Sequence, residues 1–303
     1  MTVTLSELDV LAEFDRRVAK GVIFYDGEPA IQAQELDGYK TFGADRNPKF
    51  EFAVTEAISK KPYIKNNNDE PNGGHHARRP SRPGYFPGSD IDVSGYEIDD
   101  VTDTHVVAFN KFCMYRPHLL LLTKDGYRRQ YDPLSLDDMQ ASRQMLETMN
   151  WHHFMFYNCG KDGGCSRLHK HMQLAPLCRS RLKPWPETTA SDAAPVKTPY
   201  QYILRRFEGD LGPKQIHDLY AQMMVEAKKI LGIGPRSADH VPHNVAMGRN
   251  WILVIPRRKA GVGGAYANTL GLLGMISVAN EAELRCWLDQ GAVEVLKQLG
   301  VPR

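Results

Sequence analysis

The sequence contains no apolar run long enough to cross a membrane, and its first residues lack the apolar segment of a secretion signal. A membrane helix needs about 18 or more consecutive apolar residues, and a signal peptide carries an apolar segment behind a basic start. The five cysteines are odd in number and scattered, which favours a reducing compartment over a disulfide scaffold. We therefore expect a cytoplasmic protein without a membrane partner.

An excess of charge of one sign is also missing, because 38 lysines and arginines face 36 aspartates and glutamates, a formal net charge of +2. This balance gives no overall attraction to nucleic acid, so any affinity for polyanions must be local. No repeat of solenoid length and no carboxylate cluster of a dedicated metal site is present. The 303 residues suffice for one large domain or two smaller ones.

Helical and strand patterns alternate along the chain. Apolar residues at three- and four-residue spacing predict helices in the first twenty residues, from Ser135 onward, over 215–231 and over 281–299. Apolar runs predict strands at 105–109, 118–123, 153–158, 169–177, 200–207, 244–247 and 251–256. The mixture, with hairpins, predicts an α+β fold in which helices flank an antiparallel sheet. We expect an N-terminal catalytic region over 1–185 and a C-terminal region over 186–303 packed on it.

A long segment at residues 66–90 is rich in asparagine, glycine and proline and carries two histidines and three arginines, Arg78, Arg79 and Arg82. Long segments without regular structure are either mobile surface loops or functional lids. Both interpretations stay open: a solvated loop, or a lid whose arginines contact a polyphosphate.

The most informative stretch runs from Ser166 to Leu177. Read as a strand, it places His169, His171 and Gln173 on one face, because side chains alternate along a strand. Just upstream, residues 158–166 form a glycine-rich loop whose backbone N–H groups can build an anion-binding concavity. A polar strand that follows an anion-binding loop indicates chemistry on a phosphate.

Neutral imidazole is a good nucleophile near neutral pH, with an unperturbed pKa of about 6.5. It can attack an α-phosphorus and carry the nucleotidyl group, which divides one displacement into two. We expect His171 to be this nucleophile, because the other two polar groups flank it. Gln173 would hydrogen-bond a non-bridging phosphoryl oxygen. It has no proton to give to a poor leaving group, which fits a leaving group that departs as a stable phosphate anion.

A zinc site is the competing interpretation of the same stretch. Cys159, Cys165, His169 and His171 are four plausible ligands. Their spacing matches no common structural-zinc pattern, and the glycines between them favour a loop built for close approach of the backbone. We therefore expect no protein-bound metal.

The motif His-Lys-His-Met-Gln at 169–173, after Asn158-x-Gly and Gly164-x-Ser166, resembles the diadenosine tetraphosphate (Ap4A) phosphorylases, or ATP adenylyltransferases, of fungal type. In this branch of the histidine-triad superfamily the last histidine is replaced by glutamine. The likeness extends to residues 110–112 with 117–124, and to 251–257 with 268–271. The resemblance implies a histidine-triad-like fold.

It also implies phosphorolysis of Ap4A to ATP and ADP through a covalent adenylyl-histidine, with small molecules as partners and Mg²⁺ accompanying the nucleotide. Its residue roles carry over by motif match. His171 would be the nucleophile, and His169 would orient it. Gln173 and Ser166 would hold the α-phosphate, and Asn158 and the loop at Gly164 would position the phosphates. Asn110 would contact the nucleoside side, and Lys61 would be a polyphosphate contact or an ordinary surface lysine.

Three other functions remain open. One is a sister transferase with the same His-x-His-x-Gln motif that acts on a nucleotide sugar, of the hexose-1-phosphate uridylyltransferase type. The others are simple hydrolysis and a nucleotide-binding sensor that forms no covalent species.

Overall fold

The computed structural model describes residues 5–25, 27, 30–35, 49–55, 60, 86–177, 183–188, 197–234, 237 and 240–303. Lys61 and most of the 66–90 segment, its three arginines included, lie outside the described residues. No helix in the described ranges is long and apolar enough to cross a bilayer.

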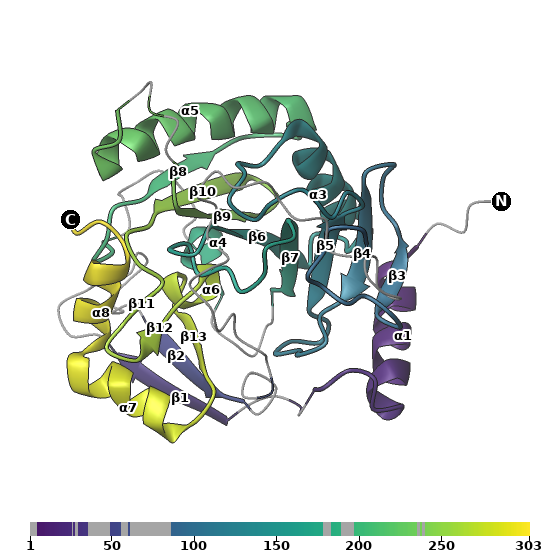
Figure 1. The fold of residues 1–303 in the computed structure, drawn as a ribbon, viewed down its shortest axis with the longest axis horizontal. Coiled ribbons are helices and arrows are strands. Elements are labelled where there is room, and N and C mark those ends of the chain that lie inside the picture. Colours follow the sequence, from purple (N-terminus) through teal and green to yellow (C-terminus); the bar gives the residue numbers. More distant parts are fainter. Residues whose placement is uncertain are drawn as a thin grey trace.

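An antiparallel sheet of eight strands forms the centre of the described chain (Figure 1). All of its neighbouring pairs are antiparallel, and β6 and β7, on either side of the glycine-rich loop, pair with each other. In spatial order the strands are β3 (Glu97–Asp100), β4 (His105–Phe109), β5 (Leu119–Thr123), β7 (His171–Pro176), β6 (His153–Cys159), β9 (His243–Met247), β10 (Trp251–Pro256) and β8 (Ile203–Arg206).

Both faces of this sheet are buried. Along β6, Met155 and Tyr157 belong to one core and Phe154 and Phe156 to the other, as the two-residue period of a strand requires. The first core packs against α1 (Glu7–Ala19), α3 (Leu136–Thr148) and α5 (Pro213–Leu231). The second packs against a smaller sheet and the last two helices. Each fully buried side chain of the size of Met155 or Phe154 contributes about 1.5–3 kcal/mol of transfer free energy.

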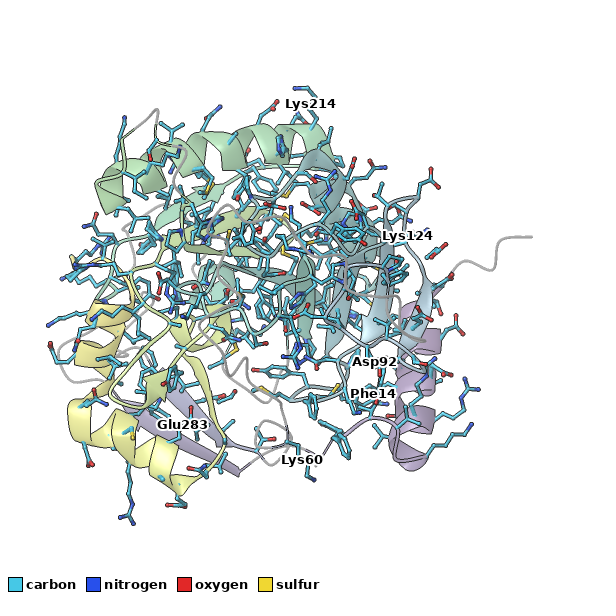
Figure 2. The ribbon with its side chains drawn as sticks, viewed as in Figure 1. Phe14, Lys60, Asp92, Lys124, Lys214 and Glu283 are labelled. Carbon is cyan, nitrogen blue, oxygen red and sulfur yellow. The ribbon has the colours of Figure 1, made fainter. Side chains whose placement is uncertain are left out.

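The smaller sheet joins early and late parts of the chain. Its strands are β1 (Ala30–Glu35), β2 (Lys49–Val54) and β13 (Met275–Val278), and β13 runs parallel to β2. Side chains fill the spaces between the layers, whereas Lys214 on α5 lies at the outer surface (Figure 2). The remaining elements are α4 (Trp185–Thr188), β11 (Gly261–Val262), β12 (Ala265–Tyr266), α6 (Thr269–Leu272), α7 (Glu281–Gln290) and α8 (Ala292–Leu299).

The four predicted helical segments are helical, with two differences in detail, whereas the short helices α4 and α6 were not predicted. The predicted closing helix over 281–299 is two helices, because Gly291 between α7 and α8 has the left-handed φ of 77° and ends the first of them. In α1 the buried residues are Val10 and Phe14, whereas Leu8 is 77% exposed. By contrast, α3 begins where predicted, after Ser135, and its first turn is a capping box in which Ser135 and Asp138 bond to each other's backbone N–H.

Candidate active site

Strand β7 begins at His171, two residues later than the sequence predicted. The backbone N–H groups of Leu168 and His169 both donate to the carboxylate of Asp90, each at 2.8 Å. His169 then forms an isolated bridge with Arg129. The predicted strand over 169–177 therefore starts two residues too early. The backbone at its start binds the carboxylate of Asp90 and the chain segment at Arg129.

The imidazole of His171 has a defined tautomer. Its Nδ1 lies 2.8 Å from the backbone oxygen of His169. A carbonyl oxygen only accepts, so Nδ1 carries the proton and the lone pair of the neutral ring lies on Nε2. Only 6% of the residue is exposed. This is the state that attack on an electrophile through Nε2 requires.

His169 orients its neighbour through the backbone, whereas its ring belongs to a separate network. Ring Nε2 lies 2.8 Å from the carbonyl oxygen of Thr123, so Nε2 donates and Nδ1 accepts from the hydroxyl of Ser89 at 2.7 Å. Burial lowers the pKa of His169 to about 4, which keeps the ring neutral at neutral pH. The ring thus fixes the chain segment whose carbonyl holds His171.

Gln173 also lies on β7, next to a histidine to which the sequence assigned no role. Oε1 of Gln173 is 3.0 Å from Nε2 of His118, and Nδ1 of that ring is 3.4 Å from Nδ2 of Asn110. Asn110 in turn accepts from the backbone of Phe112. With its oxygen bound in this way, the carboxamide of Gln173 has its NH₂ group, which can only donate, on the opposite arm.

Asn158 connects the loop to the C-terminal region. Its Oδ1 accepts from the amide of Asn244 at 3.0 Å, and from the backbone N–H and the hydroxyl of Thr269 at 2.9 and 2.7 Å. The NH₂ arm of Asn158 therefore lies opposite these donors. Asn244 also donates to the carbonyl of Gly163 at 2.7 Å, so the loop is held from behind by the C-terminal region.

Behind Asn244 lies the guanidinium of Arg257, which has no exposed surface. Its acceptors are neutral: the amide oxygen of Asn244 and the carbonyls of Lys259, Ala267 and Leu299. Burial lowers the pKa of Arg257 to about 9, so the group stays charged at neutral pH. The charge of Asp162, on the glycine-rich loop, acts on the guanidinium in the opposite direction and raises its pKa. The buried cation therefore lies behind the loop, with neutral acceptors at its N–H groups and one carboxylate of the loop near it.

The glycine-rich loop has no room for side chains at its centre. A Cβ on Gly163 would lie 2.2 Å from the carbonyl oxygen of Cys159, and one on Gly164, which has φ +83°, would lie 3.0 Å from the carbonyl oxygen of Ala267. Ser166 follows at the end of the loop and is half-buried. The glycines are therefore required by close backbone approach.

Gly163→Ala is expected to destabilise the fold by about 1–3 kcal/mol, because the new methyl group must displace backbone. It should also raise the KM for a phosphate substrate, since the loop moves. Urea unfolding and steady-state kinetics measure the two effects. The matched control is Gly234→Ala, where the added Cβ meets no atom within 4 Å. Equal unfolding free energies and equal KM values of the two variants would contradict the requirement for glycine at position 163.

The zinc interpretation finds no support in this geometry. Among the described residues, no three histidine, cysteine or carboxylate side chains are grouped as metal ligands would be. The thiol of Cys159 donates to the carbonyl of Tyr131 within the core, and burial raises its pKa. The rings of His169 and His171 have the backbone partners described above.

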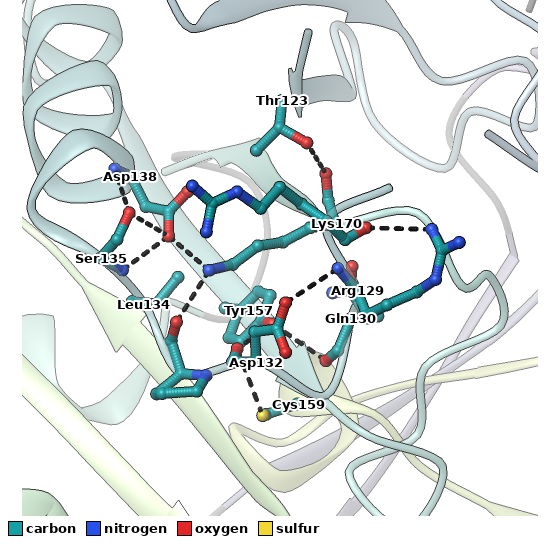
Figure 3. A network of polar contacts seen from close by, with 12 residues as sticks. Thr123, Arg129, Gln130, Asp132, Leu134, Ser135, Asp138, Tyr157, Cys159 and Lys170 are labelled. Atoms are coloured by element: carbon teal, nitrogen blue, oxygen red, sulfur yellow. Dashed lines mark hydrogen bonds and ion pairs between the residues drawn. The ribbon is translucent and has the colours of Figure 1, made fainter. Parts of the chain in front are cut away.

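A buried ion pair lies on the other side of β7 (Figure 3). Nζ of Lys170, between the two histidines, is 2.6 Å from Asp138 on α3 and donates to the carbonyl of Pro133 at 2.7 Å. The second oxygen of Asp138 is 3.0 Å from Nε2 of His105. Burial alone would raise the pKa of Asp138, but the bond from His105 and the charge of Lys170 hold it well below its usual range. This pair attaches the start of β7 to α3.

The buried histidines predict a loss of stability in acid. Burial lowers the pKa of His153, His169 and His243 to about 4, against about 6.5 in the unfolded chain. Between these values the unfolded chain binds more protons, so the stability present above pH 6.5 falls as the pH drops towards 4. Urea midpoints measured across this range should decrease steadily, and an unchanged midpoint would contradict the burial of these rings as neutral groups.

Two family models match the chain. One describes the Ap4A phosphorylase N-terminal domain and matches residues 34–189, and the other describes the ATP adenylyltransferase C-terminal domain and matches residues 196–302. Among curated proteins of Saccharomyces cerevisiae, diadenosine 5',5'''-P1,P4-tetraphosphate phosphorylase 2 is 23% identical over 58% of this chain, and protein APA1 is 24% identical over 57%. The matches span 62% and 60% of the length of these relatives.

Solved structures of yeast Ap4A phosphorylase Apa2 share the fold. The complex with AMP aligns with a TM-score of 0.69 and the complex with Ap4A with a TM-score of 0.70, each at 17% identity over 98% of this chain and 97% of the other. The expected α+β, histidine-triad-like fold, with its antiparallel sheet and flanking helices, is confirmed. Since one family model alone matches more than half of its residues, the chain belongs to the Ap4A phosphorylase family.

Proposed function

We propose that this protein catalyses the phosphorolysis of Ap4A to ATP and ADP through a covalent adenylyl-His171 intermediate. The observation that carries the proposal is the hydrogen bond from Nδ1 of His171 to the carbonyl of His169, which leaves the lone pair on Nε2. Yeast Apa2 has been crystallised with Ap4A, which supports the same substrate class here.

In the first step Nε2 of His171 attacks an α-phosphorus of Ap4A, an N–P bond forms, and the bond to the bridging oxygen breaks so that ATP departs. The adenylated ring is cationic, and the His169 carbonyl at Nδ1 stabilises that charge. In the second step inorganic phosphate attacks the same phosphorus, the N–P bond breaks, and ADP departs. The neutral ring is restored, so the reaction is a double displacement.

The other residues hold phosphate oxygens in this proposal. The NH₂ groups of Gln173 and Asn158 donate to them, and Ser166 and the backbone at Gly164 complete the loop side, with the charge of Arg257 behind it. Asn110 contacts the nucleoside in this proposal, and Lys61 contacts the polyphosphate. Mg²⁺ would be held by the oxygens of the polyphosphate as part of the substrate.

The experiment is intact-mass measurement after mixing the protein with Ap4A in the absence of phosphate. The expected result is a gain of one AMP unit and release of one ATP per chain, followed by discharge as ADP when phosphate is added. Cleavage of Ap4A that continues undiminished without phosphate would show hydrolysis and reject the proposal. A protein that binds Ap4A without any adduct would be a sensor.

A parallel reaction with UDP-glucose and phosphate distinguishes the nucleotide-sugar alternative. Uridylylated protein and turnover of UDP-glucose alone would reject the dinucleoside polyphosphate as substrate.

A further inference from the structure

The strands β6 and β7 stop pairing before they reach the residues of the site. Their register ends at Phe156 opposite Gln173. The next rungs would pair Tyr157 with Met172 and then Asn158 with His171. Those rungs are missing, although β6 continues to pair with β9 and β7 with β5 at the same level. The sheet is therefore split between the nucleophile of the proposed function and the loop strand.

The side chain of Gln130 occupies this split. Its Nε2 donates to the carbonyl of Asn158 at 3.1 Å and to the carbonyl of His171 at 3.0 Å, and its Oε1 accepts from the N–H of His171 at 2.8 Å. A neutral carboxamide offers two donors and one acceptor at these atoms, so each has a partner. The residue is 1% exposed, so water cannot replace these bonds without a change in structure.

The backbone of Gln130 is bound equally firmly. Its N–H donates to Leu168 at 2.8 Å, and its carbonyl accepts from the N–H of Gly160 at 2.9 Å and from the hydroxyl of Tyr157 (Figure 3). The segment around it thus pairs with the chain just before β7 and with the start of the glycine-rich loop. Strands in direct contact lie about 4.8 Å apart, and an amide placed between them with a hydrogen bond on each side holds them further apart.

We propose that Gln130 is a positioning residue for the reaction: its carboxamide replaces the missing rungs between β6 and β7 and sets the separation of His171 from Asn158. The proposal rests on the proposed function of His171. Among the described residues, the carboxamide of Gln130 hydrogen-bonds to backbone atoms of Asn158 and His171, so in this proposal it acts through them and not on the substrate. If the carboxamide is lost, the strands close or separate, and Nε2 of His171 moves relative to the phosphate held on the loop side.

The first test compares Gln130→Met, which keeps the length but loses all three bonds, with the wild type and with Gln144→Met. Gln144 is exposed on α3 and makes one bond, to the carbonyl of Val101 at 2.7 Å. The rate of adduct formation at saturating Ap4A should fall about 100-fold in Gln130→Met, because a displacement of about 1 Å can cost that much. The affinity for AMP and the rate of Gln144→Met should change little. A Gln130→Met rate close to that of the wild type overturns the proposal.

A second variant keeps the test decisive if the methionine variant does not fold. Gln130→Glu at neutral pH retains the acceptor but lacks both donors, whereas the protonated acid regains one. The rate of Gln130→Glu relative to wild type should therefore rise as the pH falls, and a ratio independent of pH overturns the proposal. Failure of both variants to fold would show a purely structural role. Absence of an adduct in the wild type would reject the proposed function instead.

The tautomer of His171 gives a readout that general stability does not affect. In ¹⁵N-labelled protein its Nδ1 should show the signal of a protonated nitrogen. In folded Gln130→Met this signal should shift towards a mixture of the two tautomers, since the backbone that presents the His169 carbonyl has moved. An unchanged signal together with a reduced adduct rate would overturn the positioning mechanism.

Discussion

His171→Ala should abolish phosphorolysis of Ap4A, with kcat reduced about 10⁴-fold or more, because no other group in the proposal can form the N–P bond. The adenylated form should disappear in the same variant. Folding should be retained, since the backbone of His171 pairs with Leu122 of β5 and binds Gln130 independently of the ring. Steady-state production of ATP and ADP, together with intact mass, measures both effects.

The matched control is His152→Ala. His152 is exposed and directly precedes the first residue of β6, whereas Asn158 lies near the last residue of that strand. The imidazole of His152 pairs with Glu7. Its removal should leave kcat within about twofold, as expected for a surface residue outside the reaction. If His171→Ala retained the adduct, the nucleophile would be another residue, and the double displacement through this ring would have to be given up.

Asp138→Asn should reduce the free energy of unfolding by about 3–5 kcal/mol, because it leaves the ammonium of Lys170 buried without a counter-charge. Both side chains of this pair are at most 3% exposed. Urea unfolding monitored by circular dichroism measures the loss. The control is Asp100→Asn, which removes the partner of Lys124 from a solvent-exposed pair and should cost at most about 1 kcal/mol.

The same carboxylate gives a dependence on pH with a definite sign. The folded pKa of Asp138 lies below the ordinary value of 3.8, so the unfolded chain binds a proton first as acid is added. Its contribution to stability is complete above that ordinary value and is lost as the pH falls through the folded pKa. The difference in stability between wild type and Asp138→Asn should therefore shrink at low pH, and a constant difference would contradict the ionised pair.

Local patterns in the sequence were sufficient for much of the fold. Alternation placed His171 and Gln173 together on β7, and the apolar runs identified most strands of the large sheet. The break at Gly291 was available as a glycine helix stop but was outweighed by apolar spacing on both sides.

The parts of the site that the sequence did not reveal are bonds from single side chains to distant backbone. Asp90 lies 79 residues before His169, whose N–H it binds, and Gln130 lies 41 residues before His171. Such bonds leave no periodic trace, because one carboxylate or carboxamide looks like any polar residue of a turn. The same holds for Arg257, whose burial becomes evident only when the loop is seen to pack against it.

The pairing of β9 with β6 means that the two regions recognised by separate family models share one sheet, with Asn244 from one bonded to Asn158 from the other. A chimeric protein with the N-terminal region of one distant relative and the C-terminal region of another would combine residues at these two positions that did not come from the same protein. We therefore expect substitutions at these two positions to be tolerated together rather than singly. The two regions should accordingly change together, although each is recognised by its own family model.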